Sequence, residues 1–99
     1  MPELDAKLTV NNVPIELSGF PKEFLIKTTI GAVSSLKKVG DIRNLDMSLA
    51  AGRVTIAVNG EKIPLSAFPN NIIVNTYGGL LGTLKGVERK VESFRIEIE

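Results

Sequence analysis

The sequence predicts an α+β fold, a two-layer sandwich of about six mainly antiparallel strands covered by two helices. Three observations predict it: an internal repeat, short segments that alternate apolar and polar residues, and an apolar stripe with helical spacing in each copy. With a shift of 48 positions, 12 of the 30 residues from Val10 to Val39 are identical to those from Val58 to Val87, where ordinary composition would give roughly two. The identical pairs are Val10/Val58, Asn11/Asn59, Ile15/Ile63, Leu17/Leu65, Ser18/Ser66, Phe20/Phe68, Pro21/Pro69, Thr28/Thr76, Gly31/Gly79, Leu36/Leu84, Lys37/Lys85 and Val39/Val87.

The repeat also predicts the domain organisation. A chain of 99 residues makes one domain, and a single 48-residue unit would bury too little apolar surface to be stable alone. We therefore expect one domain, 1–99, made of two repeats, 6–49 and 54–99, that share a core and are related by a pseudo-two-fold axis. The residues between the repeats, 50–53, are too few for a linker and are expected to form a turn. A closed barrel of two interlocked hairpin–helix–strand units is the alternative, because the pattern does not give the strand order.

Each repeat begins with a hairpin pattern. Apolar and polar residues alternate on both sides of Asn11-Asn12 in the first copy and of Asn59-Gly60 in the second. Asn and Gly tolerate the positive φ angles of a type I′ turn, and Asn-Gly is the strongest short hairpin signal. We therefore expect two short strands in each copy, with their apolar residues on one face.

A helix of about 17 residues is expected to follow each hairpin, since 100° spacing gathers the apolar residues of each segment into one stripe. Pro21 and Pro69 suit a first helical turn, and we expect the Ser18 and Ser66 side chains to cap the helix starts. Lys37, Lys38 and Lys85 are expected in the last turns. The segments 23–29 and 71–76 are rich in β-branched residues and could instead form extra strands. The helical stripe recurs in both copies and favours the helix.

Each repeat closes with an alternating strand. One inserted residue after Val39 restores the alignment and pairs Leu45, Met47 and Leu49 with Phe94, Ile96 and Ile98. The order of elements is therefore β-β-α-β, twice. Alternation along the strands indicates a sheet with one buried and one polar face.

The second copy resembles a group of small uncharacterised prokaryotic domains built on one hairpin–helix–strand (ββαβ) unit. The resemblance is carried by the run VNGEKIPLSAF over 58–68, the helix ending LLGTLKGV over 80–87 and the strand ESFRIEIE over 92–99. It is closest over 54–99 and looser over 8–49, where Asn12 replaces the turn glycine. The resemblance implies no activity. It implies that this chain is a fused tandem pair of such units.

Composition argues against several kinds of chemistry. The chain has no cysteine and no histidine, so thiolate chemistry and the usual base near neutral pH are excluded. Carboxylates are the only strong metal ligands left, and the spacing of Asp41 and Asp46 is not that of a calcium loop. We therefore expect no enzymatic activity, no metal and no cofactor. The absence of cysteine fits a reducing cytoplasm, and neither a signal peptide nor a membrane segment is recognisable, so we expect a cytoplasmic location.

Two groups of residues are candidates for interaction. The first, which we call the interaction strip, is poor in side-chain atoms and lies along the second predicted helix; it comprises Asn71, Asn75, Gly79, Gly82 and Gly86. Each glycine inside a helix lowers the stability of the helix by about 1 kcal/mol relative to alanine. Three glycines on one side of a helix therefore need an explanation. Close packing against the first helix near Gly31 is one explanation, contact with a second molecule is another, and the absence of any specific role is the third.

The second group is a basic patch at the same end of both repeats: Lys37, Lys38, Lys85, Arg89 and Lys90. Acidic residues interrupt the patch, and the net charge is only +1, which disfavours a nucleic-acid partner. The sequence thus favours a non-enzymatic domain that acts through protein–protein contacts, including a homo-oligomer. An RNA- or ribosome-associated module and a binder of a small apolar ligand between helices and sheet are the alternatives.

Overall fold

The computed structural model of the protein describes residues 4–36, 40–87 and 90–99. It contains the predicted ββαβ order twice, and the segments 23–29 and 71–76 are helical. The elements are β1 (Ala6–Val10), β2 (Val13–Ile15), α1 (Gly19–Leu36), β3 (Leu45–Ala50), β4 (Arg53–Val58), β5 (Glu61–Ile63), α2 (Ala67–Gly82) and β6 (Phe94–Ile98).

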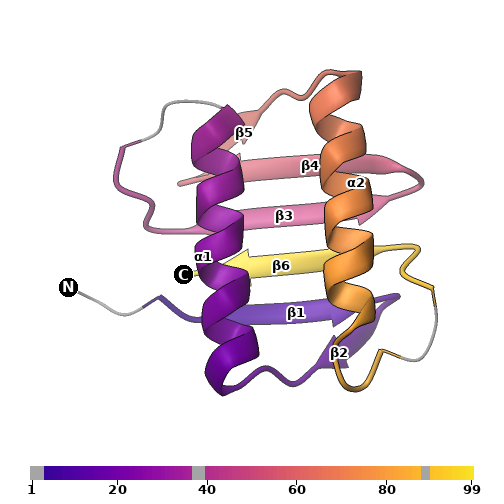
Figure 1. Cartoon of the computed structure of the whole chain (residues 1–99). Helices are drawn as coiled ribbons and strands as arrows, with labels where there is room; N and C mark the ends of the chain where they lie inside the picture. The colour runs from indigo at the N-terminus through magenta and orange to yellow at the C-terminus, as the bar shows by residue number, and fades with distance from the viewer. Residues whose placement is uncertain (1–3, 37–39, 88–89) are drawn as a thin grey trace.

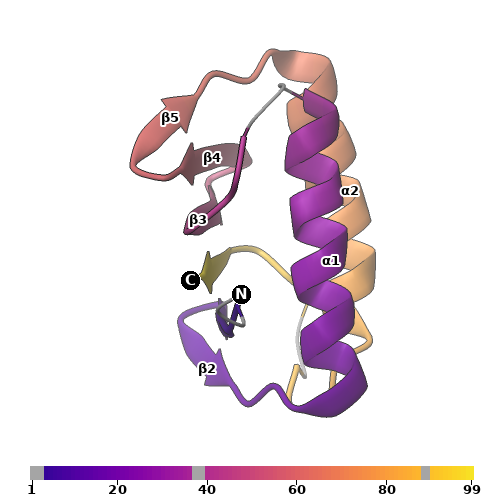
Figure 2. The same cartoon turned by 90° about the vertical axis from the view of Figure 1, so that its left-hand side faces the viewer.

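The strands form one open antiparallel sheet in the order β2-β1-β6-β3-β4-β5. Both helices lie on the same side of the sheet, and they run in opposite directions (Figures 1 and 2). The predicted two-layer sandwich is confirmed. The closed barrel is wrong, because β2 and β5 are the two edges of the sheet and do not pair with each other.

The two repeats exchange their closing strands. β6 of the second repeat pairs with β1 of the first, and β3 of the first repeat pairs with β4 of the second. Read from the other edge, the sheet order is β5-β4-β3-β6-β1-β2. This is the first order with β1 and β4, β2 and β5, and β3 and β6 exchanged. Neither repeat has its three strands side by side, since a strand of the other repeat always separates the hairpin from the closing strand.

The centre of the sheet is the pair β3–β6, where Met47 lies opposite Ile96. These two residues are aligned with each other by the repeat, and both are fully buried. The flanking pairs place Leu45 opposite Ile98 and Leu49 opposite Phe94. The deepest part of the core is therefore built equally from both repeats.

Alternate strand residues and one stripe of each helix fill the space between the layers. The buried helix residues recur at every fourth position: Leu25, Thr29 and Val33 in α1, and Ile73, Tyr77 and Leu81 in α2. Full burial of one large apolar side chain contributes roughly 1.5–3 kcal/mol, so this packing outweighs the poor helix propensity of the segments. Thr29 is the one buried polar residue among the described residues, and the apolar stripe did not predict its burial.

The helix ends differ from the prediction. Ser66 has the extended backbone of an N-cap, but its side chain makes no cap hydrogen bond, so the expected capping is wrong for this residue. A cap hydroxyl usually accepts the N–H of the second or third helical residue, and the third residue here is Pro69, which has none. The second helix ends at Gly82, so Lys85 lies beyond its last turn. Lys37 and Lys38 are outside the described residues.

Candidate functional site

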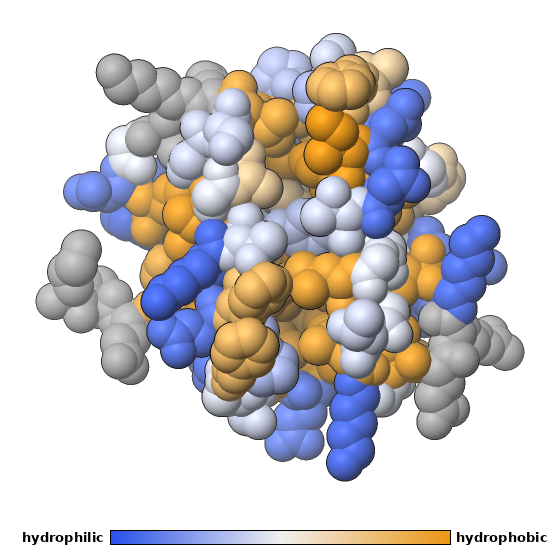
Figure 3. Space-filling model, in the orientation of Figure 1, coloured by the Kyte–Doolittle hydropathy of each residue, from blue (hydrophilic) through white to orange (hydrophobic). Residues whose placement is uncertain are grey.

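Large apolar side chains protrude from the start of both helices. Phe20 is 76% exposed and Phe68 74%, and the next turn adds Phe24 at 44% and Ile72 at 47%. The repeat aligns Phe20 with Phe68 and Phe24 with Ile72. The rings of Phe20 and Phe24 lie 5.6 Å apart between centroids. Figure 3 shows hydrophobic surface over the helical layer, the side of the molecule that faces away from the sheet. The sequence patterns did not single out these residues, although the identity of Phe20 with Phe68 was a signal.

The helical part of the interaction strip is exposed: Asn71, Asn75, Gly79 and Gly82 all face solvent. A Cβ atom built on Gly79 or Gly82 would meet no other atom within 4 Å, and the same holds for Gly31 on α1. The close helix–helix packing considered for these glycines is therefore wrong. Space for contact with another molecule remains along this side of α2.

Gly86 does not belong to the strip, because α2 ends at Gly82. It has a φ of +97°, which favours glycine, and a Cβ there would lie 3.7 Å from Ile15 Cδ1. Its role is a turn after the helix. Of the basic patch, Lys85 and Lys90 are exposed, whereas Lys37, Lys38 and Arg89 lie outside the described residues.

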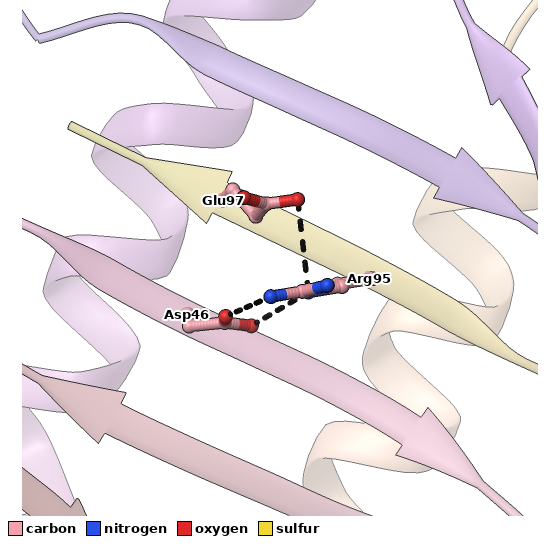
Figure 4. Close-up of polar contacts among 3 residues, drawn as sticks. All are labelled: Asp46, Arg95 and Glu97. Atoms are coloured by element: carbon pink, nitrogen blue, oxygen red, sulfur yellow. Dashed lines mark hydrogen bonds and ion pairs between the residues drawn. The ribbon is translucent and has the colours of Figure 1, made fainter. Parts of the chain in front are cut away.

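The uncovered face of the sheet carries a small charged cluster on the two central strands (Figure 4). The Arg95 guanidinium donates to both Asp46 carboxylate oxygens, at 2.7 and 3.3 Å, and lies 3.6 Å from Glu97. The hydrogen bond and charge of Asp46, followed by the charge of Glu97, raise the pKa of Arg95 above its ordinary value. All three side chains are partly exposed, so the cluster stabilises the sheet only modestly.

Asn59, in the turn between β4 and β5, holds the loop that precedes β3. Its side-chain oxygen accepts the backbone N–H groups of Arg43 (2.8 Å) and Asn44 (3.1 Å), and its side-chain nitrogen donates to the Asp41 carbonyl (2.9 Å). The backbone N–H of Asn59 donates to the Asn44 carbonyl at 2.9 Å. A residue of the second repeat thus organises a loop of the first.

Asn11, in the turn between β1 and β2, makes the reciprocal contacts. Its oxygen accepts the N–H groups of Glu92 (2.8 Å) and Ser93 (3.0 Å), and its nitrogen donates to the Lys90 carbonyl (2.9 Å). Both asparagines have a φ of 51°. The sequence predicted them as turn residues only; their shared second role depends on the exchange of strands, which the sequence did not give.

A second link between the repeats is buried beneath the helices. The Tyr77 hydroxyl donates to Thr29 Oγ1 at 2.9 Å, and these two residues are also aligned by the 48-residue shift. Burial raises the pKa of Tyr77, an effect that the hydrogen bond with Thr29 partly offsets. The bond accounts for the polar groups of both side chains, so its role is structural.

The described surface contains several hollows. One of about 500 Å³ is bordered by β4, β5 and the start of α2, with Arg53, Lys62, Leu65 and Asn70 in its lining. Another, of about 470 Å³, lies beside Asn11 and Lys90. Both are open at the edge of the molecule. The first lies where the edge of the sheet meets the start of α2, and the apolar-ligand hypothesis stays a prediction.

Within residues 4–36, 40–87 and 90–99, no three acidic side chains are grouped so that they could hold a metal ion. In the same ranges, no helix has the length and apolar character needed to cross a membrane. No family model, curated protein or solved structure matches the chain. The candidate site is therefore described from the geometry of this molecule alone.

Proposed function

We propose that this protein is a non-enzymatic domain that acts through contacts with other proteins. The observation that carries the proposal is the pair of apolar protrusions, Phe20 with Phe24 and Phe68 with Ile72, at the same place on both helices. Removing one such side chain from water contributes roughly 1.5–3 kcal/mol, a sizeable gain for a contact with a partner. Aromatic side chains are also enriched among the residues that dominate protein–protein binding.

Because each repeat carries one pair of protrusions, the proposal implies two binding sites on each chain. Because the protrusions begin helices that run in opposite directions, they lie toward opposite ends of the helical layer (Figure 1). Two similar partner segments could then be held at once, and linking two weak sites raises the overall affinity. A fused tandem pair of ββαβ units, as the resemblance implies, would present such a double site. The proposed location is the cytoplasm, in keeping with a chain that has no cysteine.

The test is capture of partners from the native host with matched variants. The wild-type chain is compared with the double substitution Phe20→Ser and Phe68→Ser, and with Lys62→Ser, which shortens an exposed side chain on β5. We expect proteins retained by the wild type and by Lys62→Ser to be lost with the double variant. The free energy of unfolding should change little, because both phenylalanines are about three-quarters exposed. Retention of the same proteins by all three chains would refute the proposal.

A further inference from the structure

The second helix differs from an ordinary surface helix in its charge. Residues 67–82 contain no aspartate, glutamate, lysine or arginine. A helix that covers one face of a sheet usually carries charged residues on its solvent side. On α2 that side instead carries Phe68 and Ile72, followed by Asn75, Gly79 and Gly82. No charged side chain of α2 therefore opposes the approach of another apolar surface.

The shape of this side is complementary to itself. Phe68, Ile72, Asn75, Gly79 and Gly82 succeed one another every three or four residues and therefore form one row along the helix. Large side chains protrude at the start of the row, and glycines with open space above them lie at its end. A second α2 in antiparallel orientation brings the large side chains of each helix onto the glycines of the other. The two Asn75 residues then meet at the centre.

Charge distinguishes α2 from α1, which has a similar row. The residue of α1 that is aligned with Asn75 is Lys27. The Lys27 side chain is largely exposed, and its ammonium group lies 3.0 Å from a carboxylate oxygen of Glu23. An antiparallel pair of α1 helices would bring two lysines together at the centre of the contact, where like charges repel. In α2 the central residue is an amide, which can both donate and accept hydrogen bonds.

From these features we propose that a second copy of this chain docks on α2, with Phe68 and Ile72 of each copy seated over Gly79 and Gly82 of the other. The contact is isologous, as in most homodimers. A stable interface buries about 800 Å² on each partner. The molecule measures 36 × 34 × 18 Å along its principal axes, so a contact centred on α2 and extending over the helical layer has room for that area. This inference specifies one partner within the proposed function.

Sedimentation velocity on the purified full chain over a concentration series tests the dimer. We expect the wild type to dimerise at micromolar concentration and Gly79→Leu to raise the dissociation constant at least tenfold. Gly31→Leu places the same side chain at the aligned position of α1, again in open space, and should leave the dissociation constant unchanged. Each variant must keep the wild-type circular dichroism spectrum. A monomeric wild type at several hundred micromolar, or an equal effect of both substitutions, would overturn the proposal.

Cross-linking tests the geometry. The chain has no cysteine, so Asn75→Cys introduces a single thiol near the centre of the contact. Disulfides form when Cα atoms come within about 7 Å, and we expect this variant to oxidise to a covalent dimer much faster than Lys27→Cys. Equal rates would contradict the antiparallel α2 pair. A monomeric chain that still captures partners through Phe20 and Phe68 would overturn the dimer and leave the proposed function standing.

Discussion

At the scale of single residues, the molecule depends on side chains that contact the other repeat. Asn11 and Asn59 each serve as a turn residue and also hold a loop of the other repeat by side-chain hydrogen bonds, 79–82 residues away for Asn11 and 15–18 residues away for Asn59. Sequence patterns predict the first role because the turn is local. The second role depends on which strands are neighbours, and that information is not local. Thr29 was missed for a similar reason, since its partner Tyr77 lies on the other helix.

The side-chain hydrogen bonds of Asn59 to the loop before β3 can be tested by substitution. Asn59→Gly keeps a residue that tolerates the φ of 51° and removes three side-chain hydrogen bonds, so we expect a loss of about 2 kcal/mol in the free energy of unfolding. Asn12→Gly is the control, since Asn12 has a φ of 65° and is exposed. It should be neutral or slightly stabilising. Urea unfolding followed by circular dichroism measures both, and equal effects would show that only the turn matters.

The buried hydroxyl pair gives a second prediction. Tyr77→Phe leaves Thr29 Oγ1 without this partner and should cost about 1–3 kcal/mol, part of which Thr29→Val should restore in the double variant. Because burial raises the pKa of Tyr77 above its ordinary 10.0, the unfolded chain releases the proton first. Stability should therefore decrease as the pH rises above about 10, and less so in Tyr77→Phe. Identical alkaline slopes for wild type and variant would contradict this assignment.

At the scale of elements, the helices show why local preference is a weak guide. The β-branched residues of 23–29 and 71–76 are compatible with strands. Both segments are nevertheless helical, because the side chains at every fourth position pack against the sheet. The period of the apolar residues predicted the helices. Their ends were less predictable, since Pro69 removes one of the two N–H groups that the Ser66 side chain could cap.

Gly31 provides a test at this scale. It lies on the outer side of α1, and an added Cβ would meet no other atom within 4 Å. Gly31→Ala should therefore stabilise the protein by about 1 kcal/mol. Gly52→Ala, at a turn residue with a φ of +76°, should destabilise it. Thermal unfolding of the two variants beside the wild type checks the sign of each effect, and a destabilising Gly31→Ala would mean that this side of α1 is already in contact.

At the scale of the whole molecule, the exchange of β3 and β6 is the central feature. The internal repeat predicted two units with one core, and the alternation of residues predicted which side of each strand is buried. Alternation does not name the neighbour of a strand, so the order β2-β1-β6-β3-β4-β5 required the structure. With Met47 and Ile96 facing each other at the centre, each repeat supplies the strand that the other lacks beside its hairpin.

The most direct test of this interdependence is the behaviour of residues 54–99 expressed alone. The fragment retains β4 from Val54 onward, β5, α2 and β6 but has no β3 between β4 and β6. We predict that at low micromolar concentration it lacks cooperative thermal unfolding by circular dichroism, and that it gains structure only as a dimer when its concentration is raised. A fragment that is monomeric by light scattering and unfolds cooperatively would contradict the prediction that the two repeats need each other.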